Sequence, residues 1–163
     1  SLEVWKMILK FAEFWTKHKQ ELIATEYHLF SDQYEYAGTA DLIVKLNGKR
    51  WLIDIKTSNS LHTSHELQLA AYSIAWNETH SEPIEQTGIL WLKAATRGEG
   101  KKDAIQGKGW QLKEIGNVVE NFKMFQNKKS IFMEDGNIQS FLRLQLKIRH
   151  CYQVVSELYG SFH

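Results

Sequence analysis

Residues 37–58 read AGTADLIVKLNGKRWLIDIKTS, and this stretch decides the fold. Asn47-Gly48 separates two runs that are rich in β-branched and aromatic residues. Both central positions of a type I′ turn need a positive φ, so Asn-Gly is the strongest two-residue signal for a hairpin. The sequence therefore predicts two antiparallel strands, over residues 34–46 and 49–58, joined at this turn.

A two-residue turn at Asn47-Gly48 also sets which residues face each other across the hairpin. Asp41 is then expected to face Asp54. Because side chains alternate between the two faces of a strand, one face carries Leu42, Val44, Leu46, Trp51, Ile53 and Ile55, and the other carries Asp41, Ile43, Lys45, Arg50, Leu52, Asp54 and Lys56. The first is a core face, and the second brings two carboxylates and a lysine together.

Two opposed aspartates need a compensating charge. Directly opposed Cβ atoms lie about 4.5–5.5 Å apart, and like charges at that position repel. A divalent cation between the carboxylates would offset the repulsion, and hard oxygen ligands suit Mg²⁺ or Mn²⁺. The alternative is a solvated face softened by Lys56 and Arg50, because surface ion pairs are common and weak. Asp is depleted in strands, which favours the site over the solvated face.

The rest of the chain predicts a mixed α/β domain. Apolar residues recur at helical spacing over residues 2–19, and residues 21–30 are typical of a strand. Thr63 and Glu66 match a capping box that begins a helix ending near Thr79. Strands are expected over 85–95 and 108–115, and helices over 117–128 and 138–159. We therefore expect a mixed central β-sheet flanked by α-helices, with residues 1–163 forming a single domain.

Composition restricts the class of protein. The chain has 163 residues, 43% of them hydrophobic and 24% charged, which is typical of a soluble globular protein. No signal peptide is visible, and no apolar run approaches the roughly 18 residues that span a bilayer. Cys151 is the single cysteine, so one chain has no internal disulfide and no all-cysteine metal or iron–sulfur site, and a cytoplasmic location is expected. The first residue is Ser1 rather than Met, which suggests an N-terminal truncation.

Positive charge is concentrated in one segment of the chain, although the chain as a whole is nearly neutral. The net charge of +1 gives no general basic bias toward nucleic acid. Between Lys93 and Lys113, however, six basic residues stand against two acidic ones, a local charge of +4. Such a loop suits phosphate binding, and a solvated hairpin loop explains it equally well.

Three motifs in this order resemble the PD-(D/E)XK nuclease superfamily, and within it the RecB-like branch that includes mitochondrial genome maintenance and phage-type exonucleases. The motifs are Gly38-Thr39-Ala40-Asp41, Asp54-Ile55-Lys56-Thr57-Ser58 and Gln68-Leu69-Ala70-Ala71-Tyr72. The resemblance covers roughly residues 21–80. It implies a restriction-endonuclease-like core with a mixed central sheet between helices.

The resemblance also implies roles for matching positions. Asp41 and Asp54 become metal ligands, with the backbone carbonyl of Ile55 as a further ligand. Lys56 orients the attacking water or stabilises the transition state. Glu26, on the strand before the first motif, corresponds to an acidic residue that the family often carries there, and would complete the metal site.

The resemblance extends to a helix and leaves some roles open. Gln68 and Tyr72 lie four residues apart on one helix face, and they would contact DNA or support Lys56. Alternatively, Tyr72 is a core residue with Gln68 at its edge. Glu26 is equally well explained as a strand-edge surface residue, and Glu35 competes with it.

Several branches of the superfamily also carry a site histidine on an N-terminal helix. His18 is the only histidine upstream of Glu26. His28, His62 and His65 are expected at the surface or in loops, although His65 begins the helix of Gln68 and is able to approach the site.

The function implied by the resemblance is that of a metal-dependent deoxyribonuclease using Mg²⁺ or Mn²⁺. An exonuclease in recombination, repair or phage DNA processing is the expected form. The alternatives are a non-catalytic DNA-binding module, the nuclease domain of a larger helicase–nuclease assembly, and a protein-interaction domain in which the motifs are coincidental. The chain contains no Ser-His-Asp pattern, phosphate-binding glycine loop, dinucleotide fingerprint or zinc spacing, so no other enzyme class has comparable support.

Overall fold

The computed structural model describes residues 2–18, 20–92 and 109–134. The chain divides into two compact units, Ser1–Phe125 and Gln126–His163. In chain order the elements are α1 (Leu2–Lys17), β1 (Gln20–Ser31), β2 (Tyr36–Leu46), β3 (Lys49–Lys56), α2 (Thr63–Thr79), β4 (Gln86–Trp91), β5 (Gln111–Ile115) and α3 (Val118–Glu134). Everything that follows about the core and the site concerns the first unit.

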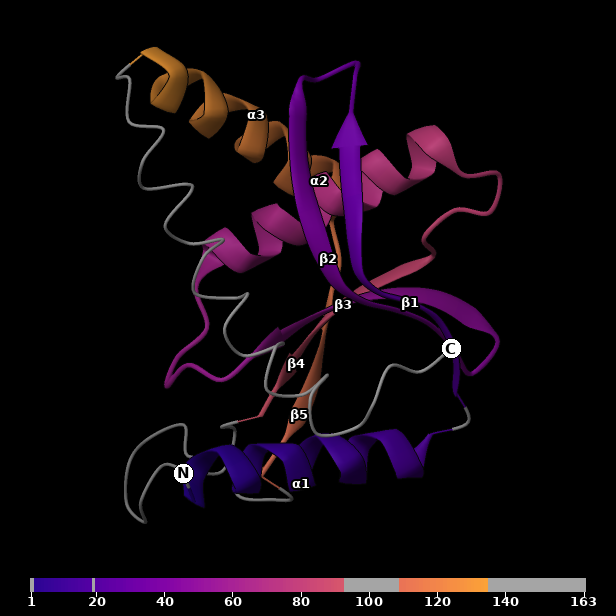
Figure 1. Ribbon diagram of the computed structural model, residues 1–163. Coiled ribbons are helices and arrows are strands. Elements are labelled where there is room, and N and C mark those ends of the chain that lie inside the picture. Colours follow the sequence, from indigo (N-terminus) through magenta and orange to yellow (C-terminus); the bar gives the residue numbers. More distant parts are fainter. Residues whose placement is uncertain (1, 19, 93–108, 135–163) are drawn as a thin grey trace. The chain divides into compact units, whose positions relative to one another are not determined.

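The five strands form one mixed sheet in the order β1-β2-β3-β4-β5 (Figure 1). The pairs β1–β2, β2–β3 and β4–β5 are antiparallel, and the pair β3–β4 is parallel. Parallel neighbours need a crossover connection, and α2 supplies it between β3 and β4. The predicted fold class, a mixed sheet flanked by helices, is confirmed.

The hairpin of β2 and β3 has the predicted turn and register. Asn47 and Gly48 have φ values of 52° and 83°, as a type I′ turn requires. The paired positions run from Leu46 opposite Lys49 to Leu42 opposite Ile53. Local turn chemistry therefore places Asp41 and Asp54 next to each other at the far end of this ladder.

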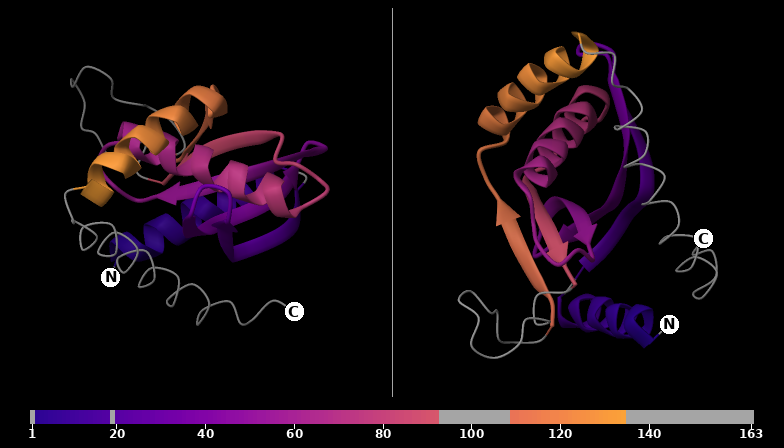
Figure 2. Two further views of the ribbon diagram at one scale, coloured as in Figure 1. Left: turned by 90° about the horizontal axis from the view of Figure 1, so that it is seen from above. Right: turned by 90° about the vertical axis from the view of Figure 1, so that its left-hand side faces the viewer.

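Both faces of the hairpin are buried. On one face, Leu42, Val44 and Ile53 pack in a cluster with Phe14 of α1, and all four are at most 2% exposed. On the other face, Ile43 and Leu52 are 0% exposed and belong to a cluster with α2 residues. Figure 2 shows α1 and α2 on opposite sides of the sheet. The face that carries the aspartates is therefore a second core face. Full burial of an apolar side chain of this size contributes about 1.5–3 kcal/mol to stability.

The alternation of faces along β2 shifts at Asp41. Ala40 and Ile43 both belong to the cluster on the α2 side, whereas Leu42 belongs to the cluster on the α1 side. Opposite this point, Glu26 of β1 lies between the pairs Thr25–Leu42 and Tyr27–Ala40 and has a φ of 47°. A positive φ in a non-glycine residue disturbs strand geometry. Figure 1 shows that β1 and β2 bend together along their length.

Several boundaries differ from expectation. The helix over 63–79 has His62 rather than Thr63 as its N-cap, since His62 has extended backbone angles. The backbone N–H of His62 donates to Nδ1 of His65 at 3.3 Å. The predicted capping box of Thr63 and Glu66 is therefore wrong by one residue. The strands expected over 85–95 and 108–115 are shorter, Gln86–Trp91 and Gln111–Ile115, and the helix expected over 117–128 continues to Glu134. Most of the basic loop and the helix expected over 138–159 lie outside the described residues.

Candidate active site

Two buried aspartates lie at the end of the hairpin ladder. Asp41 of β2 is 5% exposed and Asp54 of β3 is 4% exposed. Asp54 has the same strand parity as Leu52, so it lies on the face of the sheet that α2 covers. Burial of this kind is rare for aspartate unless the charge is paired, so the partners of these carboxylates decide what the pair does.

Each carboxylate has a partner in β3, which is the Lys56 ammonium for Asp54 and the Ile55 backbone N–H for Asp41. Nζ of Lys56 lies 3.1 Å from Oδ1 and 2.9 Å from Oδ2 of Asp54, and the Lys56 side chain is 13% exposed. The backbone N–H of Ile55 donates to Oδ2 of Asp41 at 2.8 Å. The ammonium hydrogen bond goes to Oδ1 of Asp54, and the buried Oδ2 lies 2.9 Å from the same ammonium without the alignment of a hydrogen bond. One cation therefore serves two buried carboxylates.

The shortage of positive charge is visible in the pKa of both groups. Burial raises the pKa of Asp41 from 3.8 to about 8, with the neighbouring Asp54 charge as the second cause, and the Ile55 N–H and Lys56 offset only part of the rise. Burial also raises the pKa of Asp54, against the opposing effect of Lys56. At neutral pH the pair therefore tends to retain a proton unless another cation joins it.

Helix α2 covers the carboxylates with two polar side chains. Nε2 of Gln68 donates to the hydroxyl of Tyr72 at 2.8 Å, and Tyr72 is 7% exposed. Burial raises the pKa of Tyr72, and the Asp54 and Asp41 charges act in the same direction, so the hydroxyl lies within their electrostatic reach. The structure thus brings the three sequence motifs to one place.

Gly38 allows the close approach of Tyr72. A Cβ atom at Gly38 would lie 2.2 Å from Cε1 and 2.5 Å from the hydroxyl of Tyr72. Contacts this short do not occur between real atoms, so only glycine lets the Tyr72 ring lie against β2. The glycine that opens the first motif is thereby linked physically to the tyrosine that closes the third.

The comparison with protein families agrees with this geometry. The model of the PD-(D/E)XK nuclease superfamily matches residues 3–149. The chain belongs to this superfamily. Its members are generally nucleases that typically use divalent metal ions and act on DNA, and the mixed sheet described above is consistent with their restriction-endonuclease-like fold. No curated protein matches the chain significantly in sequence.

The donor set fits the divalent cation that PD-(D/E)XK nucleases typically use. Carboxylate oxygens are the ligands that hard cations such as Mg²⁺ prefer. The two buried carboxylates share one ammonium, and together with the raised pKa of Asp41 this marks a place where a cation would replace a retained proton. Among the described residues, no third His, Cys, Asp or Glu side chain joins the two aspartates in a metal-binding group. Within the described part of the chain, a third ligand would therefore be a backbone or amide oxygen, or would require Glu26 to rearrange.

Glu26 and its competitor lie on the surface. Glu26 is adjacent to Asp41 in register, but its side chain is exposed, as are those of Thr25 and Tyr27 beside it on the edge strand β1. Glu35 is exposed in the turn before β2, with a φ of 53°. The role of Glu26 as a metal ligand remains a prediction.

Among the histidines, His28 and His62 are exposed as expected, whereas His18 and His65 are partly buried. The His18 ring contacts Phe14 in a tilted arrangement and Trp110 edge-on, with ring centroids 5.3 and 6.1 Å away. His18 therefore lies on the α1 side of the sheet, away from the α2 face. His28 bonds Thr39 at 3.0 Å and is exposed. His65 is only partly exposed, and the Lys56 charge contributes to lowering its pKa. The only indication in the sequence that His65 approaches the site is its position three residues before Gln68, on the same helix face.

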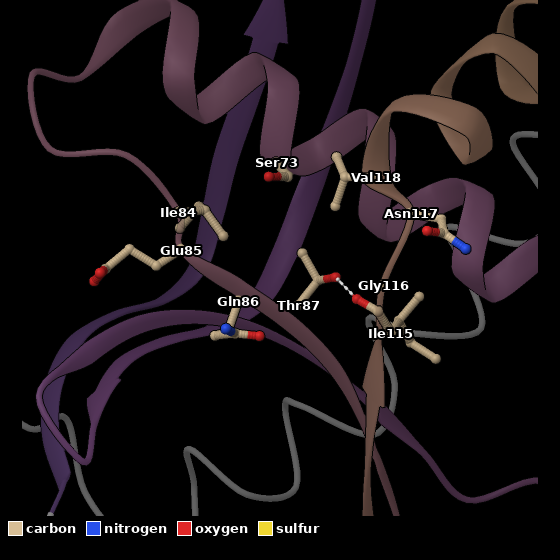
Figure 3. A pocket seen from close by; sticks show the side chains of 9 residues that line it. All are labelled: Ser73, Ile84, Glu85, Gln86, Thr87, Ile115, Gly116, Asn117 and Val118. Carbon is tan, nitrogen blue, oxygen red and sulfur yellow. Dashed lines mark hydrogen bonds between the residues drawn. The ribbon is translucent and has the colours of Figure 1, made fainter.

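A separate pocket lies between α2, β4 and the start of α3 (Figure 3). Ser73, Thr87 and Val118 line it, and the Thr87 hydroxyl donates to the carbonyl oxygen of Ile115 at 2.6 Å. Neither aspartate and no other motif residue lines this pocket. No helix among the described residues is both long and apolar enough to cross a membrane.

Proposed function

We propose that this protein is a metal-dependent deoxyribonuclease that hydrolyses phosphodiester bonds of DNA at Asp41, Asp54 and Lys56, with Mg²⁺ or Mn²⁺ as its cofactor. The observation that carries the proposal is the buried pair of carboxylates with a single ammonium partner. Such a pair is costly to maintain for stability alone, because buried charges without full compensation destabilise a fold. A catalytic requirement explains why the pair is present.

The three residues divide the work of hydrolysis. Asp41 and Asp54 would hold the cation, with the Ile55 carbonyl as a further ligand. When bound, the cation supplies a Lewis acid that polarises the phosphate and favours the hydroxide form of a bound water. Lys56 is held at Asp54 and donates to the attacking water or to a non-bridging phosphate oxygen, where negative charge develops in the transition state.

The cover formed by α2 would limit the access of water and hold the substrate. Gln68 and Tyr72 present an amide and a hydroxyl beside the carboxylates. They would contact the DNA backbone or fix the position of the Lys56 ammonium. The order and spacing of the three motifs favour the RecB-like branch and, with it, an exonuclease in recombination, repair or phage DNA processing.

The test is a cleavage assay on end-labelled linear DNA and covalently closed circular DNA, in Mg²⁺, in Mn²⁺ and in EDTA. We expect metal-dependent loss of linear DNA, abolished in Lys56→Ala. Lys45→Ala is the matched control, because Lys45 lies on the same hairpin but is exposed. Activity in Lys56→Ala equal to wild type would refute the proposed site.

The two DNA forms separate the kinds of nuclease. Loss of linear DNA alone supports an exonuclease, and cutting of the circle as well indicates an endonuclease. Binding of DNA without cleavage in any metal would favour a non-catalytic DNA-binding module.

A further inference from the structure

The first turn of α2 carries a histidine that none of the three sequence motifs includes. His65 lies one helical turn before Gln68, so the two share a helix face. His65 is a little under half buried, whereas its neighbour His62 is exposed. The face of α2 that covers the carboxylates therefore begins at His65.

The hydrogen bonding of His65 fixes which ring nitrogen carries the proton. The backbone N–H of His62 donates to Nδ1 of His65 at 3.3 Å, so Nδ1 is an acceptor without a proton. Burial, and then the charges of Lys56 and His62, lower the pKa of His65 to about 4 against the opposite effect of Glu66. The ring is therefore neutral at physiological pH, with its one proton on Nε2.

Among residues 2–18, 20–92 and 109–134, the charged groups nearest His65 have partners of their own and leave that N–H available to a substrate. Glu66, the acidic neighbour of His65, is engaged with Lys113 at 3.0 Å. The Lys56 ammonium is engaged with Asp54, and its charge acts on His65, so a cationic donor and a neutral donor lie near each other at the site. Such a pair suits two oxygens of one phosphate or of adjacent phosphates.

We propose that His65 is a further substrate-binding residue, whose neutral imidazole donates a hydrogen bond from Nε2 to a phosphate oxygen of DNA at the Asp41–Asp54–Lys56 site. The inference rests on the proposed nuclease function. A neutral donor is useful there, because it binds phosphate without competing with the cation for the carboxylates. It also makes this contact insensitive to pH across the neutral range.

Three substitutions separate substrate binding from helix capping. Glutamine at N3 of a helix accepts the N-cap N–H and keeps an amide donor, whereas glutamate keeps only the acceptor. Leucine keeps neither. His65→Gln, His65→Glu and His65→Leu are compared with His62→Gln, a control in the same turn on an exposed residue. His65→Glu is also compared with Ser64→Glu, which adds the same charge on an exposed residue of that turn, so that only a loss beyond that of Ser64→Glu counts as a lost hydrogen bond.

The measurement is the Kd of each variant for a short end-labelled DNA duplex in EDTA, by fluorescence anisotropy, beside a thermal melt. A hydrogen bond to a charged oxygen corresponds to about tenfold or more in affinity. We expect Kd near wild type for His65→Gln and His62→Gln, and about tenfold weaker binding for His65→Leu and His65→Glu. In cleavage assays with Mg²⁺ or Mn²⁺, the KM of these two variants should rise by a larger factor than their kcat falls.

Each other outcome is decisive. If His65→Glu binds like wild type, His65 is a helix cap and no more. If folded His65→Gln binds as weakly as His65→Leu, the neutral-donor role is wrong. Because binding is measured in EDTA, wild-type protein that binds but does not cut DNA would refute the nuclease proposal alone, whereas unchanged binding by His65→Leu would refute the role of His65 alone.

Discussion

Asp41→Asn tests whether the negative charge of Asp41 in the buried carboxylate pair destabilises the folded state. The folded-state pKa of Asp41 is about 8, against 3.8 in the ordinary environment. An acid whose folded pKa is raised binds more protons in the folded state than in the unfolded state. Its stability contribution is therefore present at low pH and is lost as pH rises from about 4 to about 8.

The size of this effect follows from the shift. A shift of one pKa unit corresponds to 1.36 kcal/mol, so about four units give an upper bound of about 5 kcal/mol at pH 8. Asparagine removes the charge and keeps an oxygen that is able to accept the Ile55 N–H. Without metal, we expect Asp41→Asn to be more stable than wild type at pH 8 by about 2–5 kcal/mol. At about 2–4 °C per kcal/mol for a chain of this length, Tm rises by roughly 4–20 °C.

The assay is urea or thermal unfolding in EDTA at pH 5, 6, 7 and 8. The advantage of Asp41→Asn should shrink steadily toward pH 4. Asp32→Asn is the control, because Asp32 is an exposed carboxylate in the turn after β1. Adding Mg²⁺ or Mn²⁺ at pH 8 should stabilise wild type and leave Asp41→Asn nearly unchanged. A variant that is no more stable than wild type at pH 8, or an advantage independent of pH, would refute the reasoning.

Two further predictions concern the elements that hold the site. Gly38→Ala should destabilise the fold by about 1–3 kcal/mol and reduce cleavage, because its Cβ would overlap the Tyr72 ring. Thermal melts of Gly38→Ala in the wild-type background and in the Tyr72→Ala background measure this, and an equal loss of Tm in both backgrounds would show that the overlap is not the cause. Tyr36→Phe should lower the free energy of unfolding by about 1 kcal/mol, because the Tyr36 hydroxyl donates to the carbonyl oxygen of Ala71 at 2.6 Å and fixes α2 to β2; unchanged urea unfolding would mean that water replaces this bond at no cost.

The hairpin was predictable because its determinants are local. Asn47-Gly48 sets the turn, and the alternation of apolar residues sets the register through Leu42 and Ile53. The placement of Asp41 beside Asp54 follows from these two facts. The superfamily resemblance added the helix with Gln68 and Tyr72, whose approach to β2 no local pattern indicates.

The remaining features depend on contacts distant in sequence or on single backbone angles. Burial of Ile43 and Leu52 on a second core face requires α2 to lie over them, which alternation alone does not reveal. Glu26 is exposed because it lies in the middle of β1, an edge strand whose central residues are exposed on both faces. The cap at His62 differs from the predicted Thr63 because an imidazole nitrogen replaces the usual oxygen acceptor.

The chain continues directly from the hairpin into the helix that covers it, and this has a consequence for folding. Gly38, both aspartates, Lys56, His65, Gln68 and Tyr72 all lie within residues 38–72. The entropy of closing so short a loop is small, so these groups are able to meet early, before β5 joins the sheet. The chemistry would then depend on one short stretch of chain, and insertions in the connections between other elements would change substrate access without displacing the reacting groups.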